Sequence, residues 1–307
     1  MVRTVVFAYH DVGVRCLSVL LAHGVDVALV VTHEDDPREN VFFHSVAELA
    51  RRHELPVLIA ESVDQADLLG HIARLAPDFI FSFYFRRMLP PAMLDLAHRG
   101  AFNMHGSLLP KYRGRAPVNW AILHGERETG ATLHQMVAKP DAGAIVDQQA
   151  VPILPDDIAI EVFNKVTVAA EMVLDRALPG LLDGTARLRP QDLAQGSYFG
   201  VRKPGDGRID WSRPAAAIHN LVRAVAPPYP GAFCSTSAGT LRILRTMHAP
   251  GRRPMSARPG LYCADSACFA DCADGKVLRV LAMEHDGQPL GPDEFRARFG
   301  DGKLFTS

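Results

Sequence analysis

The stretch DFIFSFYF (78–85), followed by PPAMLDLAHR (90–99) and GAFNMH (100–105), decides the fold. The first run is apolar throughout, the second has prolines followed by helical spacing, and the third begins like another buried strand. A strand, a helix and a second strand in this order are typical of a parallel sheet with helices on both faces. Because the first run does not alternate with polar residues, we expect its strand to be buried on both sides.

The same alternation extends in both directions along the chain. We expect further strands at 4–9, 25–33, 56–60, 130–138 and 144–153, and helices at 13–24, 45–54, 64–76, 116–126, 159–182 and 214–226. Ligands of open sheets of this kind bind beyond the carboxyl ends of the strands. His105 and the loop that follows it are therefore expected at the ligand-binding edge.

Beyond Phe233 the pattern changes to short apolar runs between Gly, Pro and Asp turns, at 240–248, 260–264, 267–271 and 275–285. Such spacing predicts a small closed β-barrel or sandwich. The predicted fold class is thus α/β, with a Rossmann-like parallel sheet and a small C-terminal β-barrel. We expect a catalytic domain (1–195), a connector with a helix (196–232) and an OB-like barrel domain (233–307).

Composition narrows the class of protein. Of 307 residues, 48% are hydrophobic and 22% charged, and the net charge is −1, so nothing global indicates binding to nucleic acid or to a membrane surface. MVRTVVFAYHD leads directly into a strand, and no apolar run approaches the roughly 20 residues of a membrane-spanning helix. The five cysteines are an odd number, which favours reduced thiols over a disulfide framework. We expect a cytoplasmic protein without membrane insertion.

Two polar residues interrupt the end of the apolar strand at 100–105. Asn103 and His105 are two positions apart, so their side chains lie on one face of the strand. An amide stabilises an oxyanion, and an imidazole transfers protons near neutral pH. Asp141, in the turn KPDAGA, is the nearest loop carboxylate that can support an imidazolium. Together the three residues suit acyl transfer to an amine.

Simpler interpretations of these residues stay open. Asn and His at a strand end are often turn residues that bond to the backbone. The cations of the next loop, Lys111, Arg113 and Arg115, form either a solvated turn or an anion clamp.

Several segments in combination resemble the folate-dependent formyltransferases, which include glycinamide ribonucleotide, methionyl-tRNA and sugar-nucleotide enzymes. They are FNMHGSLLPKYRGRAPVNWAI (102–122), TGATLHQM (129–136) and DAGAIV (141–146). The resemblance implies that His105 transfers the proton, that Asn103 stabilises the transition state and that Asp141 supports the protonated His105. It also implies 10-formyltetrahydrofolate as co-substrate, without a metal.

The resemblance further implies a folate site. Its residues in this sequence are Arg87, Met88, Leu89, Arg115, Val137, Ala138, Lys139, Pro140 and Asp141. The match over 87–89 is loose, and Phe85 stands where the family pattern has Tyr.

Finer features, including VVFAYHDVG (5–13) and IFSFYFRRML (80–89), are most similar to the formyltransferase acting on UDP-4-amino-4-deoxy-L-arabinose. This implies a UDP-amino sugar substrate and a role in lipid A modification and polymyxin resistance. Many such proteins carry a fused UDP-glucuronate decarboxylase, which we do not expect in a chain ending at Ser307. Nothing in the sequence decides between a monomer and a weak homodimer.

Other assignments remain as alternatives. A formyltransferase for another amino-sugar nucleotide fits the same frame. The methionyl-tRNA enzyme carries a basic insertion after its second strand, whereas HEDDPREN (33–40) holds four acidic residues and one Arg, which disfavours tRNA. A dinucleotide-binding dehydrogenase would need a Gly-x-Gly-x-x-Gly turn where AYHDVG (8–13) stands. A non-catalytic sensor on the same fold is disfavoured by the intact Asn, His and Asp.

The cysteine spacing at 263, 268 and 272 does not match a paired C-x2-C zinc site, so we expect buried thiols there.

Overall fold

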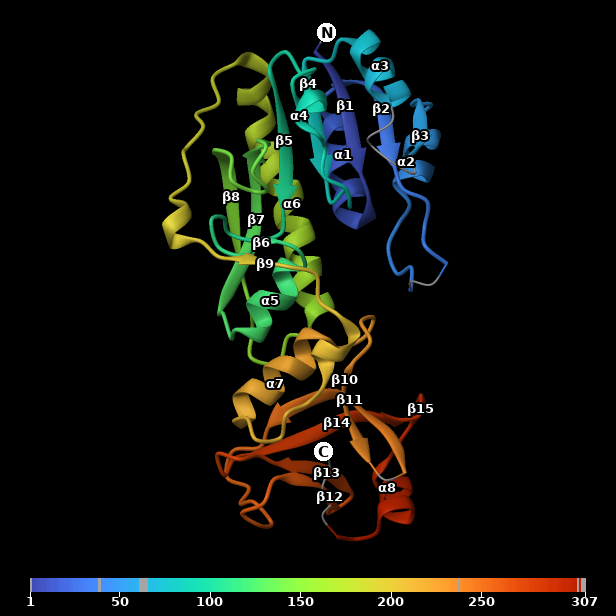
Figure 1. Ribbon diagram of the computed structural model, residues 1–307, viewed down its shortest axis with the longest axis vertical. Coiled ribbons are helices and arrows are strands. Elements are labelled where there is room, and N and C mark those ends of the chain that lie inside the picture. The colour runs from blue at the N-terminus through green and yellow to red at the C-terminus, as the bar shows by residue number, and fades with distance from the viewer. Residues whose placement is uncertain (1, 38–39, 61–65, 237, 303, 305–307) are drawn as a thin grey trace. The chain divides into compact units, whose positions relative to one another are not determined.

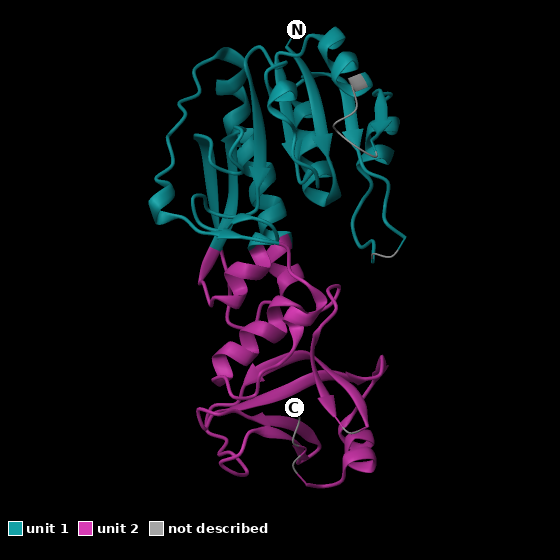
Figure 2. Cartoon of the chain, in the orientation of Figure 1, with its two compact units in different colours: residues 1–117, 129–151, 164–200 teal, residues 118–128, 152–163, 201–307 magenta. Residues whose placement is uncertain are grey.

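A computed structural model describes residues 2–37, 40–60, 66–236, 238–302 and 304 of the chain. These residues form two compact units, coloured separately in Figure 2. Unit 1 consists of Met1–Pro117, Thr129–Val151 and Asn164–Gly200, and unit 2 of Val118–Glu128, Pro152–Phe163 and Val201–Ser307. Each unit is therefore built from segments that are interleaved along the sequence.

A seven-stranded sheet forms the centre of unit 1, in the order β3-β2-β1-β4-β5-β7-β8 (Figure 1). Its strands are β1 (Arg3–Ala8), β2 (Asp26–Thr32), β3 (Val57–Ile59), β4 (Phe79–Phe83), β5 (Gly100–His105), β7 (Glu128–Gln135) and β8 (Ile145–Pro152). The pairs from β3 through β5 are parallel, whereas β7 runs antiparallel to β5. This confirms the predicted α/β class. The sheet is mixed, because β7, next to β5, runs antiparallel to the parallel strands.

The central parallel strands β1 and β4 are buried on both faces, as their unbroken apolar runs predict, whereas the edge strand β3 is largely exposed. All five residues of β4 are buried, and so are the last five residues of β1. At roughly 25 cal/mol per Å² of buried apolar surface, such strands contribute much of the stability of an α/β unit.

Helices flank this sheet. They are α1 (His10–Ala22), α2 (Val46–Arg52), α3 (Ala66–Leu75), α4 (Pro91–Leu94) and, from Asn164 on, α6 (Ala159–Asp183). The helix α5 (Pro117–Leu123) belongs almost entirely to unit 2. Ser45 caps α2, because its side chain accepts a hydrogen bond from the Glu48 amide. The helix expected over 90–99 is shorter than predicted: the amides of His98 and Arg99 donate instead to the carbonyls of Pro77 and Asp78.

Two segments with sequence-based expectations are only partly described. The predicted helix at 64–76 begins with residues 64 and 65, which lie outside the described residues. In the acidic segment 33–40, Arg38 and Glu39 also lie outside them, while Asp35 accepts a hydrogen bond from Tyr9 Oη at 2.6 Å.

Short elements connect the larger ones. In unit 1, β6 (Arg113–Gly114) pairs in parallel with β9 (Tyr198–Phe199), next to the short helix η1 (Leu193–Gln195). In unit 2, the short helix η2 (Pro204–Gly207) precedes α7 (Ala215–Ala224).

A curled antiparallel sheet forms most of the rest of unit 2, in the order β10-β11-β14-β13-β12. Its elements are β10 (Ala232–Thr236), β11 (Gly239–His248), β12 (Gly260–Ala264), β13 (Ala267–Asp271), β14 (Val277–His285), β15 (Gln288–Pro289) and α8 (Pro292–Phe299). Ile218 and Val222 of α7 share one core cluster with Ile243 and Leu278 of the sheet. The predicted small β domain is therefore confirmed as a fold, with a helix packed on it.

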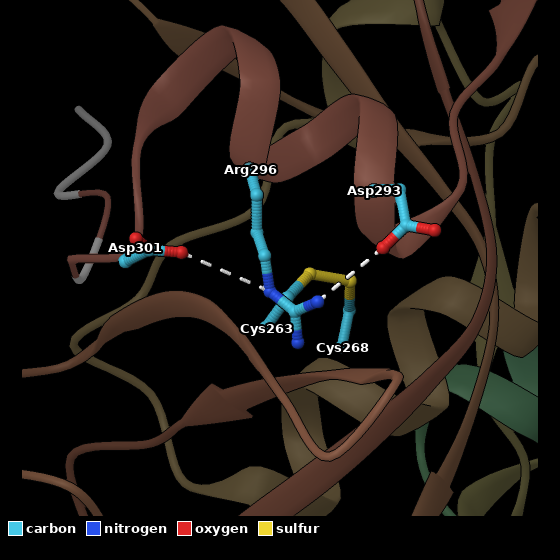
Figure 3. The surroundings of a disulfide bond; sticks show 5 residues. All are labelled: Cys263, Cys268, Asp293, Arg296 and Asp301. Atoms are coloured by element: carbon cyan, nitrogen blue, oxygen red, sulfur yellow. Dashed lines mark hydrogen bonds and ion pairs between the residues drawn. A yellow bond between two sulfur atoms is a disulfide. The ribbon is translucent and has the colours of Figure 1, made fainter.

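The expectation that all five cysteines are reduced thiols is wrong. Cys263 and Cys268 form a disulfide across the β12–β13 hairpin, beside Arg296 and its partners Asp293 and Asp301 (Figure 3). The reason is the turn between them, which is only two residues long and places Cys263 directly opposite Cys268. Cys16, Cys234 and Cys272 are free and buried.

Among the described residues, none of the helices combines the length and the apolarity that a membrane crossing requires.

Candidate active site

The site is built on β5, which lies between β4 and β7. Asn103 of β5 pairs in register with Ser82 of β4 and with His134 of β7. His105 is the last residue of β5, two positions on, so both side chains lie on the same face as expected. The sheet interior thus fixes the backbone of both polar residues.

His105 is held by oxygen atoms on two sides. Its side chain is buried, with the residue only 6% exposed. Nε2 donates a hydrogen bond to the Tyr112 carbonyl at 2.8 Å, since a carbonyl only accepts. Nδ1 lies 3.7 Å from Asp141 Oδ1. With an acceptor oxygen beside each ring nitrogen, this position can accommodate the imidazolium ion.

Asp141 reaches this place from the turn between β7 and β8. Its backbone has a φ of 51°, in the left-handed region that few non-glycine residues adopt. The Gly114 amide donates to Asp141 Oδ2 at 2.8 Å, and Gln191 Nε2 donates to the Asp141 carbonyl at 3.1 Å. The loop after β5 therefore fixes the Asp141 carboxylate through Gly114. The segment after α6 fixes the Asp141 backbone through Gln191.

The electrostatics favour an ionised Asp141. Burial by itself would raise the pKa of its carboxyl group, but the neighbouring His105, which is the largest of the lowering influences, and the Gly114 amide outweigh burial. The pKa of Asp141 is consequently held well below its ordinary value of 3.8. The site thus contains a permanent negative charge beside His105 at neutral pH.

Sequence reasoning missed His134. Its ring is buried, with the residue 2% exposed, and Nε2 lies 3.1 Å from Asn103 Nδ2 and 3.6 Å from Asp141 Oδ1. The signal was present in TGATLHQM, where a His follows five small or apolar residues of a strand. The antiparallel register that brings it opposite Asn103 was not visible in the sequence.

The loop after β5 is tightly packed at its start. A Cβ added at Gly106 would lie 1.9 Å from Tyr84 Oη, so any larger residue there would displace the Tyr84 hydroxyl group. Ser107 Oγ donates to the Lys111 carbonyl at 2.6 Å, and Thr132 Oγ1 donates to the Ser107 carbonyl at 2.6 Å. These bonds tie the loop to itself and to β7.

The three cationic residues of this loop differ in their exposure to solvent. Lys111 and Arg115 are exposed, whereas Arg113 is buried. Arg115 follows Gly114, whose amide binds Asp141, so an exposed guanidinium group is attached next to the site.

The residues expected to bind folate lie on two further loops. After β4, Arg87 is exposed, Met88 is 60% exposed and Leu89 is buried in the core. Phe85 stacks on His33 with ring centroids 4.0 Å apart, a contact that does not require the hydroxyl group of the Tyr in the family pattern.

In the turn between β7 and β8, Val137, Ala138 and Lys139 are exposed, and Pro140 is half-buried next to Asp141. Met136, just before them, packs against the same core cluster as Leu89. The loop after β4 and the turn after β7 therefore pack on the same hydrophobic cluster, through Leu89 and Met136. The described part of the chain contains no group of three or more His, Cys, Asp or Glu residues placed to hold a metal ion.

Two protein-family models match the chain. The model described as formyl transferase covers residues 15–178, and the formyl transferase C-terminal domain covers residues 202–300. The first alone spans more than half of the chain.

Solved structures with the same fold include several formyltransferases. An N-formyltransferase from Helicobacter canadensis, in complex with folinic acid and dTDP-3-aminofucose, is 20% identical, with 94% of this chain and 100% of that chain covered and a TM-score of 0.71. WlaRD, a sugar 3N-formyl transferase solved with dTDP and 5-N-formyl-THF, is 18% identical over 94% of this chain and 98% of its own, with a TM-score of 0.72.

A third similar structure is HypX from Aquifex aeolicus in complex with tetrahydrofolic acid. It is 18% identical, and the alignment covers 98% of this chain but 48% of HypX, with a TM-score of 0.65. At these identities the similarity shows a shared fold, and the family model decides membership. This chain belongs to the formyl transferase family.

Proposed function

We propose that the protein transfers a formyl group from 10-formyltetrahydrofolate to the amine of a nucleotide-linked amino sugar. The observation that carries the proposal is the convergence of Asn103, His105 and Asp141 from two segments of unit 1. Family membership supplies the formyl chemistry. The folates and the dTDP-sugar bound to proteins of the same fold support the donor and the acceptor class.

In this reaction the co-substrate supplies the formyl group, and the sugar amine attacks the formyl carbon. A C–N bond forms, and the formyl oxygen becomes an oxyanion that an Asn103 N–H group stabilises. The bond from the formyl carbon to the donor nitrogen then breaks. The amine loses one proton, the donor nitrogen gains one, and tetrahydrofolate leaves.

His105 is the residue that moves this proton in our proposal, through the ring edge that faces Asp141. The ionised carboxylate beside Nδ1 stabilises the imidazolium that exists between proton uptake and proton release. The bond from Nε2 to the Tyr112 carbonyl keeps the ring oriented meanwhile.

The folate site is proposed along the two exposed loops and Arg115. Exposed apolar side chains at Met88 and Val137 offer surface for a flat heterocycle. The positive charge of Arg115 suits the carboxylates of a folate tail.

For the acceptor, we propose UDP-4-amino-4-deoxy-L-arabinose, and with it a role in lipid A modification. The support is the resemblance of segments 5–13 and 80–89 to enzymes acting on that sugar.

A coupled assay for tetrahydrofolate release tests both levels of the proposal. The acceptors are UDP-4-amino-4-deoxy-L-arabinose, a dTDP-3-amino-sugar and methionyl-tRNA, each with 10-formyltetrahydrofolate. We expect turnover with the UDP-aminopentose to exceed turnover with the other two. Preference for the dTDP-sugar would remove the UDP assignment alone. Release with methionyl-tRNA only would overturn the sugar proposal.

A further inference from the structure

The proposed chemistry depends on how the Asn103 amide is turned. An Asn side chain has an N–H end and a C=O end, and its terminal torsion is broad and roughly two-fold, so it does not choose between them by itself. An oxyanion is stabilised by N–H and repelled by C=O. Some neighbouring group must therefore fix the orientation of this amide.

His134 is that neighbour. It lies directly opposite Asn103 in the β5–β7 register and is almost completely buried. His134 Nδ1 lies 2.8 Å from the carbonyl oxygen of Gln135. A carbonyl oxygen only accepts hydrogen bonds, so the proton of the neutral ring is on Nδ1.

A neutral ring with its proton on Nδ1 has an unprotonated Nε2, which can only accept a hydrogen bond. Nε2 carries a lone pair, and Asn103 Nδ2, at 3.1 Å, is the donor that meets it. A flipped amide would put the Asn103 oxygen against this lone pair. Asp141 Oδ1 lies farther from Nε2, at 3.6 Å, so the direct contact of Nε2 is with the amide.

We propose that His134 is a positioning residue, whose Nε2 lone pair holds Asn103 with its N–H end in the site. The Asn103 NH2 group carries two hydrogens: one binds His134, and the second is left for the formyl oxygen. The inference rests on the proposed formyl transfer for its catalytic meaning. The hydrogen bond itself is a property of the protein alone.

Two substitutions separate this role from simple packing. The side-chain amide of Gln reaches the position of Nε2, so His134→Gln can keep an acceptor for Asn103. The shorter Asn reaches only the position of Nδ1, so His134→Asn keeps the partner of Gln135 and removes the acceptor. We expect His134→Asn to lower kcat about tenfold to a hundredfold with KM nearly unchanged, since losing an oxyanion donor outright costs about 10² to 10³. His134→Gln should restore most of the kcat.

The same comparison in an Asn103→Ala background provides the decisive control. With no amide left to orient, His134→Asn should change the residual kcat less than about twofold if the two residues act as one unit. Equal losses for His134→Asn and His134→Gln, or a full further loss in the Asn103→Ala background, would show a merely structural role and overturn the proposal.

A spectroscopic readout is independent of any acceptor. In ¹⁵N NMR of protein labelled at histidine, His134 should show a protonated Nδ1 and an unprotonated Nε2, and Asn103→Ala should shift the Nε2 signal. A proton on Nε2 would overturn the proposal even in an active enzyme. If the wild-type protein formylates no amino sugar, the proposed function fails, and the NMR result still decides the His134–Asn103 bond.

Discussion

At Asp141 the backbone stands in the left-handed region, with a φ of 51°, and the carboxylate accepts the Gly114 amide at 2.8 Å. This strained residue lies between two imidazoles, His105 at 3.7 Å and His134 at 3.6 Å. Strain of this kind persists where the surrounding structure fixes it, and it occurs often at functional sites. The charge of one residue is thus placed by a loop conformation rather than by the sheet.

Replacing that charge tests its role. Asp141→Asn keeps an oxygen for the Gly114 amide but removes the negative charge beside His105. We expect turnover to fall about a hundredfold, the usual size of general acid–base assistance, with the fold unchanged by circular dichroism. Asp147→Asn is the matched control. Asp147 lies on the partly exposed strand β8, and its carboxylate pairs with Arg176 of α6 at 2.7 Å, so this variant also removes a paired carboxylate charge. Wild-type turnover in Asp141→Asn would remove this carboxylate from the mechanism.

The same residue predicts how stability depends on pH. Because the pKa of Asp141 is lower in the folded chain than its ordinary value of 3.8, the folded state binds fewer protons there than the unfolded state. The stabilisation is complete above the ordinary value and is lost as the pH falls below it. The difference in unfolding free energy between wild type and Asp141→Asn, from urea titrations, should shrink as the pH falls from about 4 to about 2. A difference that grows over this range would contradict the lowered pKa.

At the scale of elements, the short pair β6–β9 holds the loop that binds Asp141. Gly114 of β6 has a φ of 99°, and a Cβ there would lie 2.2 Å from the Phe199 carbonyl oxygen. Gly184 has a φ of 81° but nothing within 4 Å of such a Cβ. The two glycines therefore separate the effect of backbone strain from the effect of a steric clash.

We expect Gly184→Ala to cost about 1 kcal/mol of stability, from the positive φ alone. Gly114→Ala should cost more and should also lower turnover, since the clash displaces the amide that binds Asp141. Chemical denaturation and kcat for both variants check this. Equal stabilities and full activity in both would show that the β6–β9 pair does not hold the site.

The β12–β13 hairpin makes a chemical prediction. With Cys263 and Cys268 joined and Cys16, Cys234 and Cys272 free, the denatured chain should titrate three thiols before reduction and five after it. The double variant Cys263→Ser/Cys268→Ser should titrate three under both conditions. Five thiols without reductant would show that the pair is open in the isolated protein.

Much of the fold could be read from the sequence, because local patterns decide it. The strand expected at 100–105 is β5, and those at 260–264 and 267–271 are β12 and β13, with the predicted bounds. What could not be read depends on pairings between distant segments. His134 acquires its role from an antiparallel register with β5.

The same limit applies to the cysteines and to the site. The disulfide depends on a two-residue turn at Asp265 and Ser266, whose positive φ values of 51° and 58° the sequence did not suggest. Asn103, His105 and Asp141 were found because residue chemistry and family resemblance indicated them. Their roles, and those of the folate-binding loops, stay predictions until the variants are measured.

At the scale of the whole molecule, the two units interleave along the sequence. Segments 118–128 and 152–163 belong to unit 2, although unit 1 surrounds them in the chain. Within unit 2, Asn119 Nδ2 donates to the Ala224 carbonyl at 2.7 Å, and Arg223 donates to the Leu154 and Asp157 carbonyls at 3.3 Å. These bonds join the two inserted segments to α7.

A fragment ending at Gly200 should therefore be unstable, even though it contains every residue of the proposed site. It keeps both inserted segments but removes α7, which binds them through Arg223 and the Ala224 carbonyl, and β11, whose Arg245 pairs with Glu161. We expect a broad, low-temperature unfolding transition by circular dichroism and aggregation at micromolar concentration. Asn119→Ala in the full chain is a milder version, and should cost about 1–3 kcal/mol by leaving a buried carbonyl unpaired. A cooperative transition with full turnover in the fragment would contradict this.

The interleaving also sets an order of events during synthesis. Once residue 200 has left the ribosome, all of unit 1 is available, but segments 118–128 and 152–163 still lack their hydrogen-bond partners on α7. The remaining stretch takes roughly 5 to 20 s to translate at about 5 to 20 residues per second. During that interval the nascent chain carries two segments of unit 2 without the rest of that unit, a state that chaperones are suited to shield.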